Sequence, residues 1–317
     1  MKKSAKNYTR TNVNAYRSVT ACYVIFTVLA LASCSGEADP LPEMYTMQQV
    51  TVNGGNISYI DEGEGMPIVL IHGIPTSSFL WRKMIGNLAV HGRVIAPDLP
   101  GFGFSNPPAN GDYSISNYAR LLGDFLEALS IADGVLICHD FGGPVTVMYA
   151  LRHPERYQRL IILDTFLHTD LPDWGLFYKV TKIRPIGEVI MGIAGQTITG
   201  AGLKAGVVNK SMITQEVVQR YYKPEGSADK VKSTYLGTMR TDYHKDLIYI
   251  EDNLKSIDKP TLIAWGENDV YIPLSLAERI HQDIDGSKMS IIPNCGHFLQ
   301  EDEPRKVTNI IVDFISN

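Results

Sequence analysis

Short apolar runs alternate with amphipathic segments along most of the chain after residue 45. Eight of these runs are rich in β-branched and aromatic residues and have the length of strands. The third to the seventh are apolar at nearly every position, which is the pattern of parallel strands that are covered on both faces. The predicted strands are residues 47–52, 57–61, 67–73, 93–99, 134–140, 159–166, 260–269 and 289–297.

Amphipathic segments with helical spacing lie between these strands. In residues 117–129, Leu122, Phe125 and Leu129 recur at the spacing of one helix face. Further segments of this kind are residues 143–157, 274–284 and 303–315. Strands that alternate with helices predict an α/β fold, here a doubly wound, mostly parallel sheet of eight strands.

The alternation stops at residues 166–249. This stretch has aromatic, glycine-rich and helix-like pieces, and it contains no clear strand. An insertion beyond the carboxyl ends of the strands would lie over the place where such sheets bind ligands. We therefore predict a mainly helical cap at residues 166–249, inserted between two parts of the sheet domain at residues 44–165 and 250–317.

The N-terminus has the pattern of an export signal. Residues 1–20 contain five basic residues and no acid, and an apolar run of twelve residues follows at 21–32. Because a membrane-spanning helix needs about 20 residues, a cleaved secretory signal is predicted instead. The stretch Leu31-Ala32-Ser33-Cys34 resembles a bacterial lipobox, which implies a signal peptide at residues 1–34, lipidation of Cys34 and a linker at residues 35–43.

The protein is therefore expected to be exported and anchored at a bacterial membrane, in the periplasm or on the cell surface. The lipid on Cys34 would be its membrane contact, without a span. The alternative is an uncleaved apolar anchor that carries an unrelated cysteine.

Charge and cysteine content argue against several classes of protein. The formal net charge is −5 and no cluster of basic residues follows the N-terminal region, so nucleic-acid binding is not expected. The chain has neither a CxxC pair nor an HExxH motif, so no metal site is expected. Cys138 and Cys295 are interpreted as unpaired, small apolar residues near the predicted strands. No segment predicts an oligomeric state.

Asp140 stands where a strand meets a helix. It follows the apolar run 134–139 and precedes Gly142 and Gly143, whose small size allows a tight bend. A bend of this kind is the nucleophile elbow of many hydrolases, and the chain has no GxSxG serine to compete with Asp140. The alternative reading of Asp140 is an N-cap of the helix that follows.

Two further strand ends carry residues that suit catalysis. Asp269 follows the seventh predicted strand, and His297 follows the eighth in the turn Asn294-Cys295-Gly296-His297. Asp140, Asp269 and His297 thus give a nucleophile, an acid and a histidine in the chain order of an α/β-hydrolase triad. His139, beside the elbow, is interpreted as structural.

The segments HGIPTSSFLWR (72–82), APDLPGFGFSNPP (96–108), HDFGG (139–143) and CGHFLQEDEP (295–304) resemble the α/β-hydrolase superfamily. They are most similar to its aspartate-nucleophile branch of haloalkane dehalogenases and epoxide hydrolases. The resemblance implies an oxyanion hole formed by the backbone N–H groups of Ile74 and Phe141. It also leaves Asp164, at the end of the sixth strand, as an alternative triad acid to Asp269.

The resemblance implies hydrolysis through a covalent aspartyl ester. Asp140 attacks a carbon of a small, largely apolar organic substrate, and water activated by His297 then cleaves the ester. The expected reaction needs water and no cofactor. Carbon–halogen hydrolysis follows the overall motif similarity, with epoxide hydrolysis as the alternative, and a non-catalytic receptor for a small ligand is the interpretation outside enzymes.

The leaving group is where the sequence departs from the dehalogenases. They offer a halide an indole N–H beside the nucleophile and a second side-chain donor in the turn at residue 74, but this chain has Phe141 and Ile74 there. A cap residue could supply a donor to a halide or, for epoxide opening, to an alkoxide. The pocket residues considered for this region are Trp174, Tyr178, Tyr221, Tyr222, Tyr235 and Tyr243.

Overall fold

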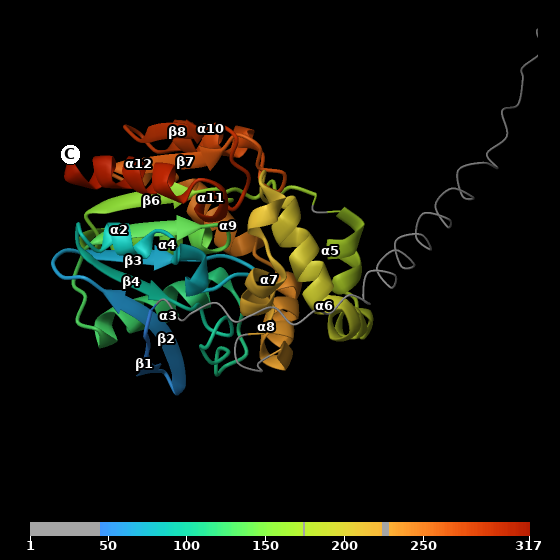
Figure 1. Cartoon of the computed structure of the whole chain (residues 1–317). Coiled ribbons are helices and arrows are strands. Elements are labelled where there is room, and N and C mark those ends of the chain that lie inside the picture. Colours follow the sequence, from blue (N-terminus) through green and yellow to red (C-terminus); the bar gives the residue numbers. More distant parts are fainter. Residues whose placement is uncertain (1–44, 174, 224–227) are drawn as a thin grey trace, which may run out of the picture. The chain divides into compact units, whose positions relative to one another are not determined.

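An eight-stranded sheet in the order β1-β2-β4-β3-β5-β6-β7-β8 is the centre of the computed structural model, which describes residues 45–173, 175–223 and 228–317 (Figure 1). β2 pairs antiparallel with β1 and with β4, and every other neighbouring pair is parallel. The strands are β1 (Met47–Val52), β2 (Gly55–Glu62), β3 (Pro67–Ile71), β4 (Arg93–Pro97), β5 (Val135–His139), β6 (Arg159–Leu163), β7 (Thr261–Gly266) and β8 (Lys288–Ile292). The predicted doubly wound, mostly parallel sheet is confirmed.

Helices cover both faces of this sheet. They are α2 (Ile85–Leu88), α3 (Ile115–Ala128), α4 (Gly142–Arg152), α5 (Gly175–Thr181), α6 (Ile186–Ala205), α7 (Gln215–Tyr222), α8 (Ala228–Arg240), α9 (His244–Asn253), α10 (Leu274–Asp283), α11 (Leu299–Asp302) and α12 (Pro304–Ser316). Short 3-10 helices are η1 (Ser78–Trp81), η2 (Pro154–Arg156), η3 (Lys210–Met212) and η5 (Leu254–Ser256).

Successive side chains of a strand point to opposite faces, and this alternation divides the core in two. In β3, Val69 and Ile71 pack with α3, α4, α9 and α10 on one face. Ile68 and Leu70 pack with α2 and α12 on the other. The strands need apolar residues at every position because both faces are covered.

The insertion after β6 is helical. α5 to α8 lie together at one end of the sheet (Figure 1), and Met191, Tyr222 and Leu236 form a small apolar cluster among them. The predicted division at residues 249 and 250 falls inside α9. Leu247 and Ile250 of this helix join the apolar core of the sheet domain.

The predicted leader, the lipidated Cys34 and the linker lie outside the described residues. None of the helices in the described ranges has the length and apolar character that a membrane span requires. Cys138 and Cys295 are buried and free, which confirms the unpaired interpretation.

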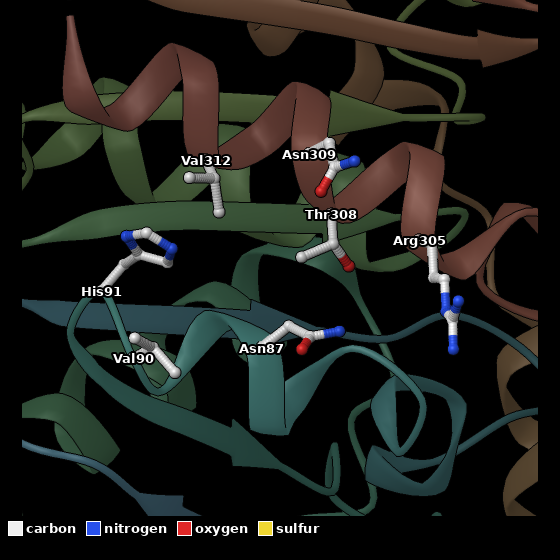
Figure 2. A pocket seen from close by; sticks show the side chains of 7 residues that line it. All are labelled: Asn87, Val90, His91, Arg305, Thr308, Asn309 and Val312. Atoms are coloured by element: carbon white, nitrogen blue, oxygen red, sulfur yellow. The ribbon is translucent and has the colours of Figure 1, made fainter.

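A surface hollow of about 420 Å³ lies between α2 and α12 (Figure 2). It is lined by Asn87, Val90, His91, Arg305, Thr308, Asn309 and Val312. None of the residues predicted to be catalytic lines this hollow, so the chemistry of the site is sought at the carboxyl ends of the strands.

Candidate active site

Asp140 occupies a strained bend between β5 and α4. Its φ angle is 51°, in the left-handed region that residues other than glycine rarely adopt. A Cβ on Gly142 would lie 2.5 Å from two carbonyl oxygens, and one on Gly143 would lie 1.9 Å from Thr165 Oγ1. The two glycines therefore allow the tight turn that lifts Asp140 out of the sheet.

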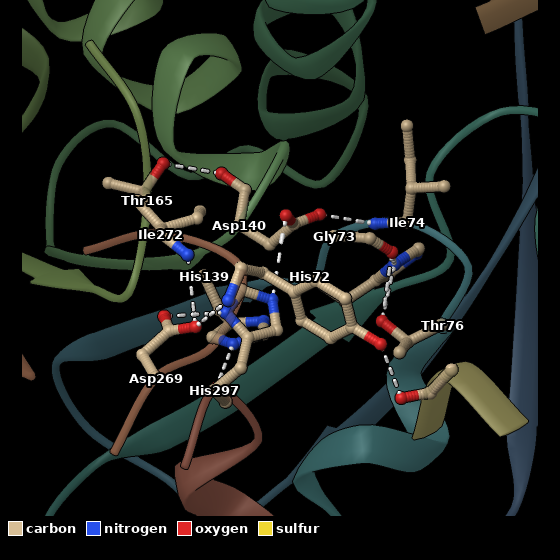
Figure 3. Close-up of polar contacts among 12 residues, drawn as sticks. His72, Gly73, Ile74, Thr76, His139, Asp140, Thr165, Asp269, Ile272 and His297 are labelled. Carbon is tan, nitrogen blue, oxygen red and sulfur yellow. Dashed lines mark hydrogen bonds and ion pairs between the residues drawn. The ribbon is translucent and has the colours of Figure 1, made fainter. Parts of the chain in front are cut away.

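The two oxygens of the Asp140 carboxylate have different surroundings. Oδ1 accepts a hydrogen bond of 2.7 Å from the backbone N–H of Ile74. Oδ2 lies 3.6 Å from His297 Nε2 (Figure 3). The N-cap position of α4 is Phe141, and no side chain caps this helix. The alternative reading of Asp140 as a helix cap is therefore wrong.

The turn that presents Ile74 is fixed by His72. The buried His72 ring donates from Nδ1 to the Gly73 carbonyl oxygen at 2.8 Å and accepts at Nε2 from the Leu99 N–H at 2.8 Å. Burial lowers the pKa of His72, which suits a neutral ring that donates at one nitrogen and accepts at the other. This ring holds the turn in a position where the Ile74 N–H points at Asp140.

His297 is held between two carboxylates. Its Nδ1 bonds Asp269 Oδ2 at 2.9 Å, while its Nε2 faces Asp140. Burial alone lowers the pKa of His297, but the charge of Asp269 and the interactions with Asp140 outweigh burial and raise it well above its ordinary value. The exposed side-chain fractions are 2% for His297, 1% for Asp269 and 16% for Asp140, so Asp140 is the most open of the three to an incoming molecule.

Backbone donors hold the acid that orients His297. Asp269 Oδ1 accepts hydrogen bonds from the N–H groups of Tyr271 and Ile272 at 2.7 and 3.0 Å. Burial raises the pKa of Asp269, but the charge and hydrogen bond of His297, with these two N–H groups, bring it below its ordinary value. Asp269 is therefore a carboxylate at neutral pH.

Asp164 also lies near His297, but its protonation state differs from that of Asp269. Its ligand atom lies within 4.8 Å of those of Asp269 and His297. It is fully buried and accepts one N–H, from Gly266 at 2.9 Å, and its Oδ2 has no hydrogen-bond partner among the described residues. Burial first, and then the charge of Asp269, raise the pKa of Asp164 well above its ordinary value. Asp164 is therefore a neutral acid next to the charged Asp269.

The trio of Asp164, Asp269 and His297 is the one acid and histidine group in the described ranges that is close enough to hold a metal ion. Its contacts fit a hydrogen-bonded site better, because His297 Nδ1 is bound by Asp269 and Asp164 keeps its proton. His297 is thus hydrogen-bonded to Asp269 directly, and Asp164 lies within 4.8 Å of this pair without a hydrogen bond to His297.

His139 holds the backbone of His297 in place through a hydrogen bond. Its Nε2 lies 2.8 Å from the carbonyl oxygen of His297, so this nitrogen carries the proton and donates. Burial and the neighbouring charge of His297 lower the pKa of His139 to about 3, and the two rings lie with centroids 4.7 Å apart. His139 is a neutral donor that positions His297, in keeping with the structural interpretation.

The backbone N–H of Phe141 is the second donor expected beside Asp140. It has no hydrogen-bond partner in the part of the chain that the structure describes. The Phe141 ring is 1% exposed and packs against Tyr118 and Tyr243, with centroids 5.3 and 5.4 Å away. The ring thus serves as packing, which leaves the N–H available to a ligand.

Three of the tyrosines considered for the pocket have hydroxyl groups that are already bound. The acceptors are Glu301 for Tyr221, the Met191 carbonyl for Tyr222 and the Thr238 carbonyl for Tyr243. Lys182 donates to the hydroxyl of Tyr178 at 3.3 Å. Trp174 lies outside the described residues.

Tyr235 differs from the other cap tyrosines. Its hydroxyl makes no hydrogen bond to any other residue that the structure describes. Burial, together with Tyr178, Tyr271 and the charge of Asp140, raises the pKa of Tyr235 to about 12. The phenol of Tyr235 therefore keeps its proton, and the charge of Asp140 is one cause of its raised pKa.

Tyr271 is a site residue that the sequence did not single out. Its ring meets the His297 ring edge to face with centroids 5.4 Å apart, and its hydroxyl donates to the Gly202 carbonyl of α6 at 2.7 Å. It thus joins the histidine to the cap. Its position two residues after Asp269 was the one signal that could have marked it.

Glu301 forms a second buried charge cluster. Its carboxylate receives two hydrogen bonds from Arg82 at 2.6 and 2.9 Å and one from Tyr221 at 3.0 Å, with Lys83 Nζ at 2.7 Å. Glu301 is fully buried. Burial raises its pKa, but the hydrogen bonds and charges of Arg82 and Lys83 lower it overall. The cluster links η1, α11 and the cap helix α7.

Comparison with known proteins agrees with this geometry. A family model described as the alpha/beta hydrolase fold matches residues 66–183 and 219–304. The chain belongs to the α/β-hydrolase family and is a hydrolase with haloalkane dehalogenases among its relatives.

Two sequence relatives and one solved structure with the same fold are similar to this chain. A haloalkane dehalogenase from Psychrobacter cryohalolentis is 31% identical over 274 residues, which cover 82% of this chain and 87% of that protein. A 2-hydroxy-6-oxo-2,4-heptadienoate hydrolase from Pseudomonas putida is 27% identical over 281 residues and covers 85% and 96%. The solved structure of the epoxide hydrolase CorEH has a TM-score of 0.72, with 22% identity over 86% of this chain and 98% of that one.

Proposed function

We propose that the protein hydrolyses a small, apolar organic substrate through an ester on Asp140, and that a carbon–halogen bond is the bond it cleaves. The observation that carries the proposal is the asymmetry of the Asp140 carboxylate. Oδ1 is held by the Ile74 N–H, while Oδ2 faces His297 from the other side. One oxygen is thus fixed in a donor site, and the other is free to bond to carbon.

In the first step, Oδ2 of Asp140 attacks an sp³ carbon, the bond to the leaving group breaks, and the leaving group takes the electron pair. Asp140 needs no base for this attack, because a carboxylate oxygen attacks with its own electron pair and loses no proton. The product is an alkyl ester whose carbonyl oxygen is Oδ1, still bound to the Ile74 N–H.

In the second step, water attacks Cγ of this ester and gives a proton to His297 Nε2. The oxyanion forms on Oδ1, where the N–H groups of Ile74 and Phe141 stabilise it by about 3 kcal/mol per donor. The intermediate then expels the alcohol, which takes the proton back from His297. Asp269 orients the ring and stabilises its cationic form.

The charges of the site fit this order of steps. Asp140 as an anion is one cause of the raised pKa of His297. Ester formation removes that charge, so the pKa of His297 falls when a base is required. The neutral Nε2 of His297 can then accept a proton from water in the second step.

The leaving group requires a donor, since the side chains of Phe141 and Ile74 provide none. The phenol of Tyr235 makes no hydrogen bond to a described residue and has a pKa that the charge of Asp140 helps to raise, so it is the described cap residue that best fits this role. A phenol O–H can bind a departing halide. It can also protonate the alkoxide of an opened epoxide, and this observation supports epoxide hydrolysis as the second function.

The proposal includes the place of the protein in the cell. The basic and apolar N-terminal segments, followed by Cys34, support export and a lipid anchor. Palmitate labelling of the expressed full chain tests this part, since Cys34→Ala would remove the label.

The ester is tested with His297→Phe, which removes the base and leaves the nucleophile. Incubation of this variant with a 1-bromoalkane, and separately with a styrene-oxide-like epoxide, is expected to add the alkyl mass to Asp140, as read by intact-mass measurement and peptide mapping. The substrate that leaves an adduct identifies the class of reaction.

The control is His153→Phe, since the His153 side chain is 48% exposed and lies at the opposite end of α4 from Asp140. This control should turn over substrate and accumulate no adduct. An unmodified His297→Phe chain, with a substrate that the wild type consumes, would refute the ester. Binding of that substrate without turnover in the wild type would favour a receptor.

A further inference from the structure

Exposed aliphatic side chains gather at the start of α6. Four of the eleven large apolar residues that are exposed in the described ranges lie within residues 183–193. They are Ile183, Ile186, Val189 and Ile193, with exposed fractions of 50%, 43%, 54% and 70%. Single exposed apolar residues are ordinary on protein surfaces, but a group this dense marks an interaction site.

The helical spacing places three of these residues on one stripe. Ile186, Val189 and Ile193 are at positions i, i+3 and i+7 of α6. The opposite side of the helix is occupied, because Met191 is buried in the cluster with Tyr222 and Leu236. The exposed stripe is thus a second apolar face of α6, and cap packing does not account for it.

Positive charge accompanies this stripe. Residues 173–205 contain four cations, Lys179, Lys182, Arg184 and Lys204, and two acids, Asp173 and Glu188, in a chain whose net charge is −5. Asp173 is paired with Lys179 at 2.7 Å. The Arg184 side chain is 79% exposed beside Ile183 and Ile186. Glu188 is bound by Arg240 at 2.6 Å, which neutralises its charge, and it also lies 4.0 Å from Arg184. A cationic, aliphatic surface on an acidic protein matches a lipid surface with anionic headgroups.

We infer that the stripe of α6, with the adjoining Ile183 and Arg184, contacts an anionic lipid bilayer. The aliphatic side chains would enter the boundary between headgroups and acyl chains, and the cations would lie at the level of the headgroups. The inference does not depend on the reaction proposed above, because none of these residues belongs to the site around Asp140.

The test is hydrogen–deuterium exchange, measured by mass spectrometry on the full chain with vesicles of phosphatidylglycerol and phosphatidylcholine in equal parts. Peptides covering residues 183–193 are expected to exchange about fivefold more slowly than without vesicles, while peptides of α12 stay unchanged. Near 1 M salt, where the Debye length is about 3 Å, this protection should decrease.

Val189→Glu with Ile193→Glu is expected to abolish the protection and leave turnover of a soluble substrate unchanged, since both positions are exposed. The matched control is Val90→Glu, because Val90 is 81% exposed but lies between α2 and β4. This control should keep the protection.

Three outcomes would overturn the inference. One is equal exchange of residues 183–193 with and without vesicles. A second is protection that the double variant retains. The third is protection that rises with protein concentration in the absence of vesicles, which would show that a second copy of the chain covers the stripe.

Discussion

The variants Asp164→Asn and Asp269→Asn, which replace the two buried acids near His297, should differ strongly in their rates of ester hydrolysis. The ligand atoms of Asp164 and Asp269 lie within 4.8 Å of each other. Two full charges at that separation repel by about 3 kcal/mol at an effective dielectric constant of about 20. Such repulsion equals roughly 2 pKa units and adds to burial, which is the larger cause of the raised pKa of Asp164, so only one of the two acids is ionised at neutral pH.

The hydrogen bonds assign the charge to Asp269. Asp269 accepts two backbone N–H groups and bonds His297, whereas Asp164 accepts one N–H. In Asp164→Asn the amide oxygen still accepts from Gly266 and a charge is not lost, so turnover should fall by less than about tenfold. In Asp269→Asn the imidazole loses its anionic partner, and the same exchange in a serine triad costs about 10⁴ in rate.

The assay is a single-turnover experiment that follows ester and product separately. Asp269→Asn should form the ester at the wild-type rate and hydrolyse it slowly, because the histidine is needed only in the second step. Asp164→Asn should show both steps close to wild type. A larger loss of ester hydrolysis in Asp164→Asn than in Asp269→Asn would refute this division of roles.

Three further changes test the site and its support. Asp140→Asn should lower the pKa of His297, measured by ¹⁵N NMR of the imidazole, because one cause of the raised pKa is removed; an unchanged pKa would contradict the coupling. Gly73→Ala places a Cβ 2.2 Å from Asp140 Oδ1 and displaces the nucleophile, so kcat should fall about 10²-fold. The affinity for substrate should fall less than kcat does. Glu301→Gln removes the anion that binds Arg82, and urea unfolding should show a loss of about 3 kcal/mol at neutral pH. Because the pKa of Glu301 is lower in the folded state, its carboxylate stabilises the fold fully above about pH 4.3. This contribution is lost as the pH falls through the folded-state pKa, so the unfolding free energies of wild type and variant should converge there.

The fold could be predicted from the sequence because local pattern and tertiary environment agree. Continuous apolar runs became the buried parallel strands, and the small residues after Asp140 became the tight bend. The three strand ends that carry Asp140, Asp269 and His297 meet at one edge because parallel strands share a direction. A family resemblance then added the Ile74 turn, whose hydrogen bond to Asp140 depends on geometry that periodicity alone does not contain.

The remaining features depend on contacts between segments that are far apart in the chain. The sequence places Asp164 and Asp269 at two strand ends, but only their separation and burial show which one keeps a proton. Cap tyrosines look alike in the sequence, and only their hydrogen bonds set Tyr235 apart. Tyr271 was missed because an aromatic residue in a loop has no local signature of contact with a histidine.

The Glu301 cluster has a consequence for how the insertion can move. Tyr221 of α7 binds a carboxylate that is also tied to Arg82 of the sheet domain, so this helix is fastened to the layer beneath it. If the whole insertion moved away from the sheet, the Glu301 carboxylate would lose its hydrogen bond from Tyr221. A hydrogen bond to a charged group contributes about 1.5–3 kcal/mol, so this movement is unfavourable. The insertion is therefore not expected to move away from the sheet domain as one unit, because α7 is bound to the layer beneath it.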